Sequence, residues 1–254
     1  RSDYTRVVKD YQVTITISYR RTPEQIQSLV NVTGSSAIRE ELCQVLREFR
    51  GEAALRVGYF SEDQDYIAAL IRQAYYDTPE AALGMPEFTI TLYPDEAASG
   101  PRIVEILLTY PQDIQTLRTR SQDLVNLADS LLAGSYGLSS ADAAQRVFSL
   151  VTQQAVYRAE AGGTAYDALY GGSANSEGMA LAYLLLAQRA DLDAHLVQGS
   201  LNGTQHMWNM VRVGTSRWRH VDAAQSDGSV LLYTDEQMTA LGYEWDQEEY
   251  PVCG

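Results

Sequence analysis

The stretch GGSANSEGMALAYLLL, residues 171–186, decides how the rest of the chain is interpreted. Two glycines open a loop, and the nearly all-apolar segment after it predicts a helix buried at the centre of its domain. Asn175 is a favoured helix N-cap residue, so Ser176 falls in the first turn. Backbone N–H groups and the helix dipole at that position stabilise a nucleophile's anion and a developing oxyanion. A plain helix start also favours serine, so these residues alone do not establish a site.

The segment 206–222 (HMWNMVRVGTSRWRHVD) predicts two strands joined by a three-residue turn. With that turn as the hairpin loop, Val213 pairs with Arg217. The same register places His206 and Asp222 on one face of the sheet, diagonal to each other at a Cβ separation of about 7 Å or less. A carboxylate at that distance can orient an imidazole. A slip of one residue would put the two side chains on opposite faces.

The order of these features resembles the transglutaminase-like superfamily, relatives of papain-type cysteine proteases. A nucleophile position at the start of a buried helix is followed by His-x-Trp-Asn at residues 206–209 and by Trp-x-His-Val-Asp at residues 218–222. The resemblance extends from about Val147 to Cys253. It implies an α+β fold in which the helix packs against an antiparallel sheet.

The resemblance also implies roles for site residues. Members of this type attack an amide carbonyl with a cysteine thiolate, which a histidine and an orienting aspartate activate. The corresponding residues here are Ser176, His206 and Asp222, because SEGMA at 176–180 stands where the family has Cys-x-Gly-x-Ala. Trp208 is a candidate substrate-binding residue on the face of His206, although a strand tryptophan more often packs in a core.

Serine at the nucleophile position leaves three explanations open. The protein has lost catalysis and binds a peptide or cell-wall polymer, or a native cysteine was replaced by serine, or Ser176 itself attacks with His206 as base. A hydroxyl is far less acidic than a thiol, whose reference pKa is about 8.5, which favours the first explanation. We therefore predict a catalytically impaired module, with an active amide hydrolase or transamidase as the alternative. Neither Cys43 nor Cys253 occupies the nucleophile position.

The residues before the transglutaminase-like part predict an N-terminal α/β subdomain over 1–110, with the second domain at 111–254. The pattern indicates strands at 11–19, 54–60, 88–93 and 103–110, and helices at 36–49 and from about 64 to 76. Two further helices are expected at 114–132 and at 139–157.

Composition excludes several classes of protein. The 254 residues carry 19 basic and 33 acidic side chains, a net charge of −14, which disfavours nucleic-acid binding. The longest apolar run, residues 179–187, is less than half of a membrane span. His195, His206 and His220 lack the short paired spacing of a metal site, and two cysteines alone do not make one. We therefore expect no metal, no cofactor and no integral membrane segment.

The chain begins at Arg1 without an initiator methionine or an apolar leader. This start indicates either a removed targeting segment or a chain that was shortened, and we expect the first. Together with the resemblance to bacterial members, it predicts a secreted or envelope-anchored protein outside the cytoplasm. The expected partner is a peptide or protein substrate, or a cell-wall polymer.

Overall fold

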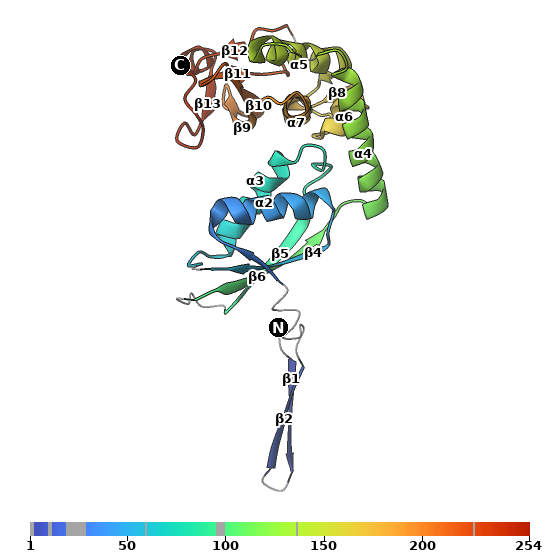
Figure 1. Ribbon diagram of the computed structural model, residues 1–254, viewed down its shortest axis with the longest axis vertical. Helices are drawn as coiled ribbons and strands as arrows, with labels where there is room; N and C mark the ends of the chain where they lie inside the picture. Colours follow the sequence, from blue (N-terminus) through green and yellow to red (C-terminus); the bar gives the residue numbers. More distant parts are fainter. Residues whose placement is uncertain are drawn as a thin grey trace.

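The computed structural model describes residues 3–9, 12–18, 29–58, 60–94, 100–135, 137–225 and 227–254. The fold is α+β, as predicted, and its body contains two sheets with helices packed on each (Figure 1). A separate antiparallel hairpin is formed by β1 (Asp3–Lys9) and β2 (Gln12–Ser18).

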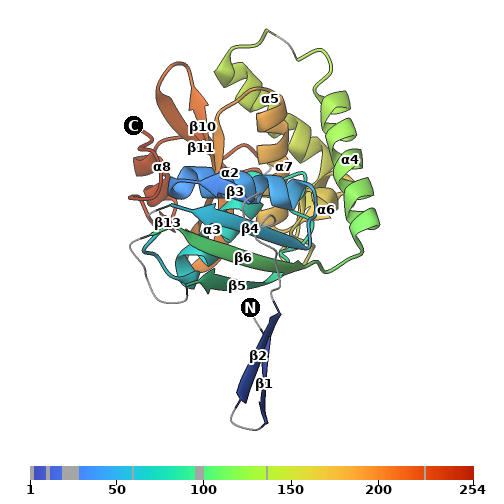
Figure 2. The same ribbon diagram turned by 60° about the horizontal axis from the view of Figure 1, so that its bottom comes forward.

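The N-terminal part is built on a four-stranded sheet. Its strands lie side by side in Figure 2, in the order β3 (Val30–Val32), β4 (Glu52–Val57), β6 (Arg102–Thr109) and β5 (Glu87–Tyr93). Only β3 and β4 are parallel. Two amphipathic helices, α2 (Gly34–Arg47) and α3 (Gln64–Asp77), pack against each other and bury their apolar stripes.

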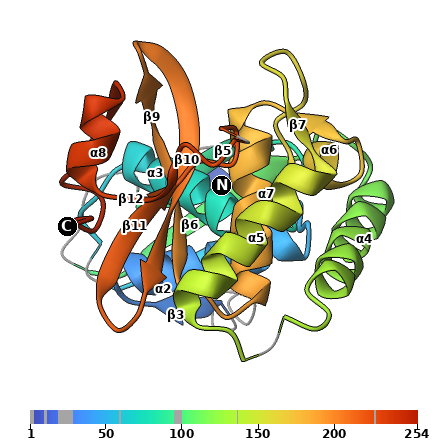
Figure 3. The same ribbon diagram turned by 90° about the horizontal axis from the view of Figure 1, so that it is seen from above.

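The C-terminal part is built on an antiparallel sheet of five strands. Their order is β12 (Leu231–Tyr233), β11 (Arg217–Val221), β10 (Thr204–Val213), β9 (Ala194–Leu201) and β13 (Tyr243–Trp245). Helix α7 (Ser176–Arg189) packs on β10 and β9, and α5 (Ser140–Gln154) lies beside it (Figure 3). The remaining elements are α4 (Ile114–Leu131), α6 (Ala165–Leu169), α8 (Asp235–Ala240), and the parallel pair β7 (Val156–Tyr157) and β8 (Ser173–Ala174).

The hairpin register is the predicted one, with Val213 opposite Arg217. The other predicted helices and strands in the described residues are present, with ends that differ by up to three residues. The helix predicted to reach about Tyr157 ends earlier, because α5 stops at Gln154. Ala155 adopts extended backbone, with φ −135° and ψ 148°, and the next two residues pair with β8 instead.

One continuous hydrophobic core links the two parts of the chain. It includes Leu55 and Ile67 from the N-terminal part and Val147, Leu184 and Val221 from the C-terminal part. The division at residue 110 falls between β6 and α4, but a shared core does not test it, so the two-domain division stays a prediction. None of the helices in the described parts of the chain is long and apolar enough to cross a membrane.

Candidate active site

The start of α7 is held in place by its cap and by a glycine. Asn175 is the N-cap, as predicted, and its Oδ1 accepts a hydrogen bond from the Gly178 N–H at 3.1 Å. A Cβ at position 178 would lie 2.8 Å from both the Thr164 carbonyl oxygen and the Ala174 Cβ. Glycine is therefore required for the first turn of α7 to approach the preceding loop this closely.

Ser176 lies half-buried at the first position of this helix. Its Oγ accepts a hydrogen bond from the backbone N–H of Met207 at 3.3 Å. Met207 follows His206 on β10, so this contact sets the hydroxyl against the strand that carries the histidine.

His206 and Asp222 form a buried pair. The imidazole Nε2 and the carboxylate Oδ2 are 2.7 Å apart, and the two residues are 5% and 1% exposed. Among the described residues, the other ring nitrogen, Nδ1, has no hydrogen-bond partner. The structure thus brings His206 and Asp222 into contact, whereas the Ser176 hydroxyl contacts the backbone of the residue that follows His206.

The Asp222 carboxylate has two further donors that sequence reasoning did not identify. The Tyr243 hydroxyl donates to Oδ2 at 2.7 Å, and the Ala224 N–H donates to Oδ1 at 2.9 Å. Burial and the neighbouring carboxylate raise the pKa of Tyr243, so it stays a donor. Tyr243 lies on β13, which pairs with β9, and no local sequence signal connects it to Asp222.

Tyr157 is the other missed residue. Its ring centroid is 6.4 Å from that of His206, and the residue is 39% exposed, so it forms part of the accessible side of the site.

Trp208 lies in the interior, with 0% of its surface exposed. Its indole N–H donates to His220 Nδ1 at 2.9 Å, and its ring packs edge-on against Tyr243 and Trp245. A Cβ on Gly199 would come within 2.7 Å of this ring, which explains the glycine. A substrate in a surface groove would not reach Trp208, so its position is that of a core residue.

The three histidines are not gathered at one place. His195 stacks on Trp218 with ring centroids 4.8 Å apart, whereas His206 and His220 each contact a different carboxylate. Burial lowers the pKa of His195 and of His220.

Within the described residues, one group has metal-ligating atoms close together. Single ligand atoms of His220, Asp235 and Cys253 all lie within 4.8 Å of one another. The Trp208 N–H occupies the His220 Nδ1 lone pair, so a neutral ring carries its proton on Nε2 and donates it to Asp235 at 2.8 Å. A metal bound to Nε2 requires the ring proton on Nδ1. Nδ1 already accepts the Trp208 N–H, so it cannot carry that proton without losing this hydrogen bond. Burial also raises the pKa of Cys253 to about 12, which opposes the thiolate. These residues do not fit a metal.

Glu177 is the acidic residue that follows Ser176 in the sequence. Its Oε1 accepts a hydrogen bond from the Tyr76 hydroxyl of α3 at 3.2 Å, a contact between the two parts of the chain. Burial raises the pKa of Glu177. A carboxylate at this place opposes the formation of a second negative charge on a nucleophile.

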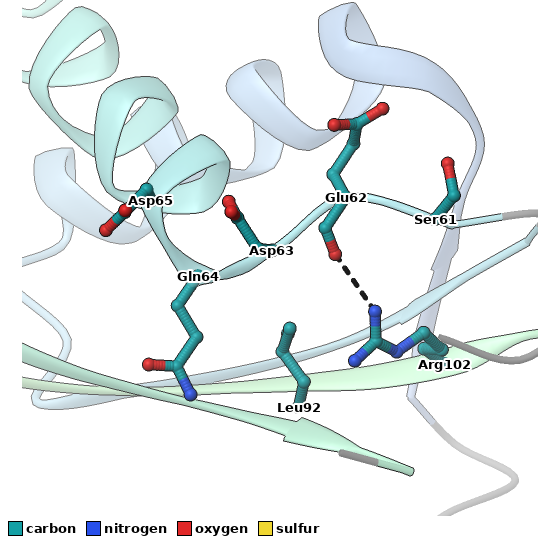
Figure 4. Close-up of a pocket in the computed structure, with 7 residues that line it drawn as sticks. All are labelled: Ser61, Glu62, Asp63, Gln64, Asp65, Leu92 and Arg102. Carbon is teal, nitrogen blue, oxygen red and sulfur yellow. Dashed lines mark hydrogen bonds between the residues drawn. The ribbon is translucent and has the colours of Figure 1, made fainter. Parts of the chain in front are cut away.

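A cavity of about 360 Å³ at the start of α3 is separate from this site (Figure 4). Its polar groups hold the fold together. Arg102 donates to the carbonyl oxygens of Glu62 at 2.9 Å and Pro94 at 3.1 Å, and the Asp63 side chain caps α3.

A buried helix that begins with the nucleophile position, packed against an antiparallel sheet with a histidine–aspartate pair, defines the papain-like class of fold. Residues 126–223 match the family model of the transglutaminase-like superfamily, so the C-terminal part of this chain contains a transglutaminase-like domain. The match ends at residue 223, and the resemblance of the tail to Cys253 stays a prediction.

The solved structures similar to the chain include the following two. One is a protein from Cytophaga hutchinsonii assigned as a cysteine protease, with 12% identity and a TM-score of 0.37 over 65% of this chain and 72% of that one. The other is a TGase, with 14% identity and a TM-score of 0.39 over 92% of this chain and 67% of that one. No curated protein matches the sequence at a significant level.

Proposed function

We propose that the chain is a transglutaminase-like module with a degenerate Ser176–His206–Asp222 triad, impaired in catalysis, that binds a peptide or a cell-wall polymer at the bacterial envelope. One observation carries this proposal: the buried histidine–aspartate pair is formed, and the side chain at position 176, which contacts the residue after that histidine, ends in a hydroxyl. A thiol is ionised readily by such a pair, whereas a hydroxyl must lose its proton during attack.

One neighbour of the hydroxyl supports impairment. The Glu177 carboxyl group adjoins Ser176 in sequence, and a carboxylate opposes a second negative charge on a nucleophile. The location outside the cytoplasm belongs to the proposal as well, and it stands on the resemblance to bacterial members.

An acylation experiment separates this function from the alternative of an active serine enzyme. p-Nitrophenyl acetate acylates activated nucleophiles without requiring a specific substrate, and mass spectrometry locates the acetyl group. We expect no acetylation of Ser176 beyond that of ordinary exposed serines, and no change in the His206→Ala variant. Acetylation of Ser176 that disappears in His206→Ala would instead establish a working serine nucleophile.

The explanation that a native cysteine was replaced by serine has a direct test. The codon for residue 176 in the native gene decides whether the serine is natural, and a cysteine codon would end the proposal of a degenerate triad.

A further inference from the structure

A cavity of about 490 Å³ lies where α3, α7, the first half of β9 and the C-terminal tail meet. Its volume is in the range of about 300–1,000 Å³ that is usual for ligand sites. Its lining comes from both parts of the chain and includes Tyr76 on α3 and Tyr250 in the tail. Figure 1 shows α3 on the side of the N-terminal part that faces α7 and β9.

One side of this cavity is an unpaired strand edge. Strand β13 covers β9 only at residues 199–201, and within the described chain no strand pairs with residues 194–197 on that side. Consecutive residues on both faces of β9, including His195 and Leu196, line the cavity. This is expected where a strand presents its edge rather than one face.

The direction of the backbone groups follows from two hydrogen bonds. The Asp193 carbonyl accepts from the Arg212 N–H at 2.8 Å, toward β10, so the N–H of Ala194 in the same peptide unit points away from β10. The Gln198 N–H also points away, because it donates to the Tyr250 hydroxyl at 3.2 Å. By the two-residue alternation of a strand, the N–H and C=O of Leu196 share this direction.

The Tyr250 hydroxyl therefore stands where the carbonyl of a neighbouring strand would be. It accepts the outward N–H of Gln198, whereas the outward backbone N–H and C=O groups of Ala194 and Leu196 face the cavity. Backbone donors and acceptors that lie in a cleft need partners. Alternating donors and acceptors at strand spacing match the backbone of another extended chain.

We propose that this cleft binds an extended peptide, about four residues of which add to the free edge of β9 through main-chain hydrogen bonds. The site is separate from the triad and requires no reaction there. It lies along α7 on the side of the nucleophile, since Tyr76 both lines the cleft and donates to Glu177, the neighbour of Ser176.

Recognition in this cleft is led by the peptide backbone rather than by charge. The Arg39 guanidinium in the lining is engaged by the Asp77 carboxylate, with Nη2 and Oδ1 2.6 Å apart. The lining has one further arginine, Arg72, and one further acid, Glu249, whose charges balance. A neutral peptide with strong β-propensity is therefore a suitable probe.

The test uses the full chain and the peptide Thr-Val-Thr-Val-Thr-Val-amide with fluorescein on its N-terminus, measured by fluorescence anisotropy. Two analogues are N-methylated, one at the threonines and the other at the valines, so that each removes the donors from one edge of the peptide. We expect saturable binding of the parent and a loss of about tenfold for one analogue only. Equal affinity of all three peptides, or no saturable binding, would overturn the proposal.

A variant pair locates the site. Ala194→Pro removes one outward N–H at the first residue of β9, where proline is tolerated because no ladder bond is lost. We expect this variant to bind the parent peptide several-fold more weakly. Ala194→Ser keeps the backbone N–H and should bind the peptide as tightly as the unaltered chain does.

If Ala194→Pro fails to fold, amide NMR of the unaltered chain decides the question. Peptide-induced shifts at Ala194 and Leu196 support the site. Shifts confined to the strands around His206 and Asp222 would contradict it. None of these results depends on the reactivity of Ser176, so failure here is distinct from failure of the proposed function.

Discussion

Two histidines of the five-stranded sheet each pair with a carboxylate at nearly the same distance, in opposite surroundings. His206 and Asp222 are 2.7 Å apart, and His220 and Asp235 are 2.8 Å apart. The second ring nitrogen of His220 accepts the Trp208 N–H, whereas that of His206 has no hydrogen-bond partner among the described residues. We call these the sealed pair and the open pair.

The difference shows that contact with a carboxylate does not by itself make a histidine a base. The sealed pair ties the tail to the sheet, because Asp235 also accepts the Cys253 N–H at 2.8 Å. The open pair leaves one ring nitrogen without a hydrogen-bond partner among the described residues, and the residue after His206 contacts the Ser176 hydroxyl. What the far nitrogen faces is the feature that separates a structural pair from a candidate catalytic one.

The largest effect on stability is expected when the aspartate of each pair is replaced by alanine. Asp222→Ala leaves the His206 ring, the Tyr243 hydroxyl and a backbone N–H without their acceptor in the interior, and we expect a loss of about 3–5 kcal/mol in the free energy of unfolding. Asp235 is 24% exposed at its side chain, so water can replace it, and Asp235→Ala should cost about 1–3 kcal/mol. Urea unfolding measures both. Equal losses would contradict the difference in environment.

A smaller effect concerns the additional donor of the open pair. Tyr243→Phe removes one hydrogen bond to a buried carboxylate that keeps two other donors, and we expect a cost of about 1.5 kcal/mol in the same measurement. Tyr250→Phe is the matched control, since it removes a hydroxyl bonded only to a backbone N–H at the cleft, and about 0.5 kcal/mol is expected. A larger loss for the control would argue against the position assigned to Tyr243.

The sealed pair should also make stability depend on pH. Burial holds the pKa of His220 below its ordinary value of 6.5. Below pH 6.5 the unfolded chain therefore binds more protons at this residue, and the free energy of unfolding falls as the pH decreases. The slope from one such group cannot exceed about 1.4 kcal/mol per pH unit. His220→Gln should flatten the acid side of the stability profile, and an unchanged profile would contradict a buried neutral ring.

The smallest expected effect is that of Glu177 on the reactivity of a thiol at position 176. In a Ser176→Cys background, Glu177→Gln removes an acidic group beside the thiol and should favour its ionisation. We expect the rate of alkylation by iodoacetamide to rise about two- to fivefold at neutral pH. A slower rate would show that Glu177 assists the nucleophile instead.

The sequence predicted the elements whose signals are local. The apolar helix, its Asn175 cap and the turn that pairs Val213 with Arg217 each depend on nearby residues, so the geometry between His206 and Asp222 followed. Tyr243 could not be predicted, because it reaches Asp222 only through the pairing of β13 with β9. The burial of Trp208 likewise depends on long-range packing, here against Tyr243 and Trp245.

The central claim is that the open pair can activate a thiol placed at position 176. The most direct measurement is the iodoacetamide reactivity of each thiol in Ser176→Cys at near-neutral pH, read by mass spectrometry. Cys43 and Cys253 are internal controls, since burial raises their pKa values to about 11 and about 12. We predict that the introduced thiol reacts at least tenfold faster than either control, and that His206→Ala removes most of this advantage. A thiol as inert as the two buried cysteines, or one indifferent to His206, would contradict the claim.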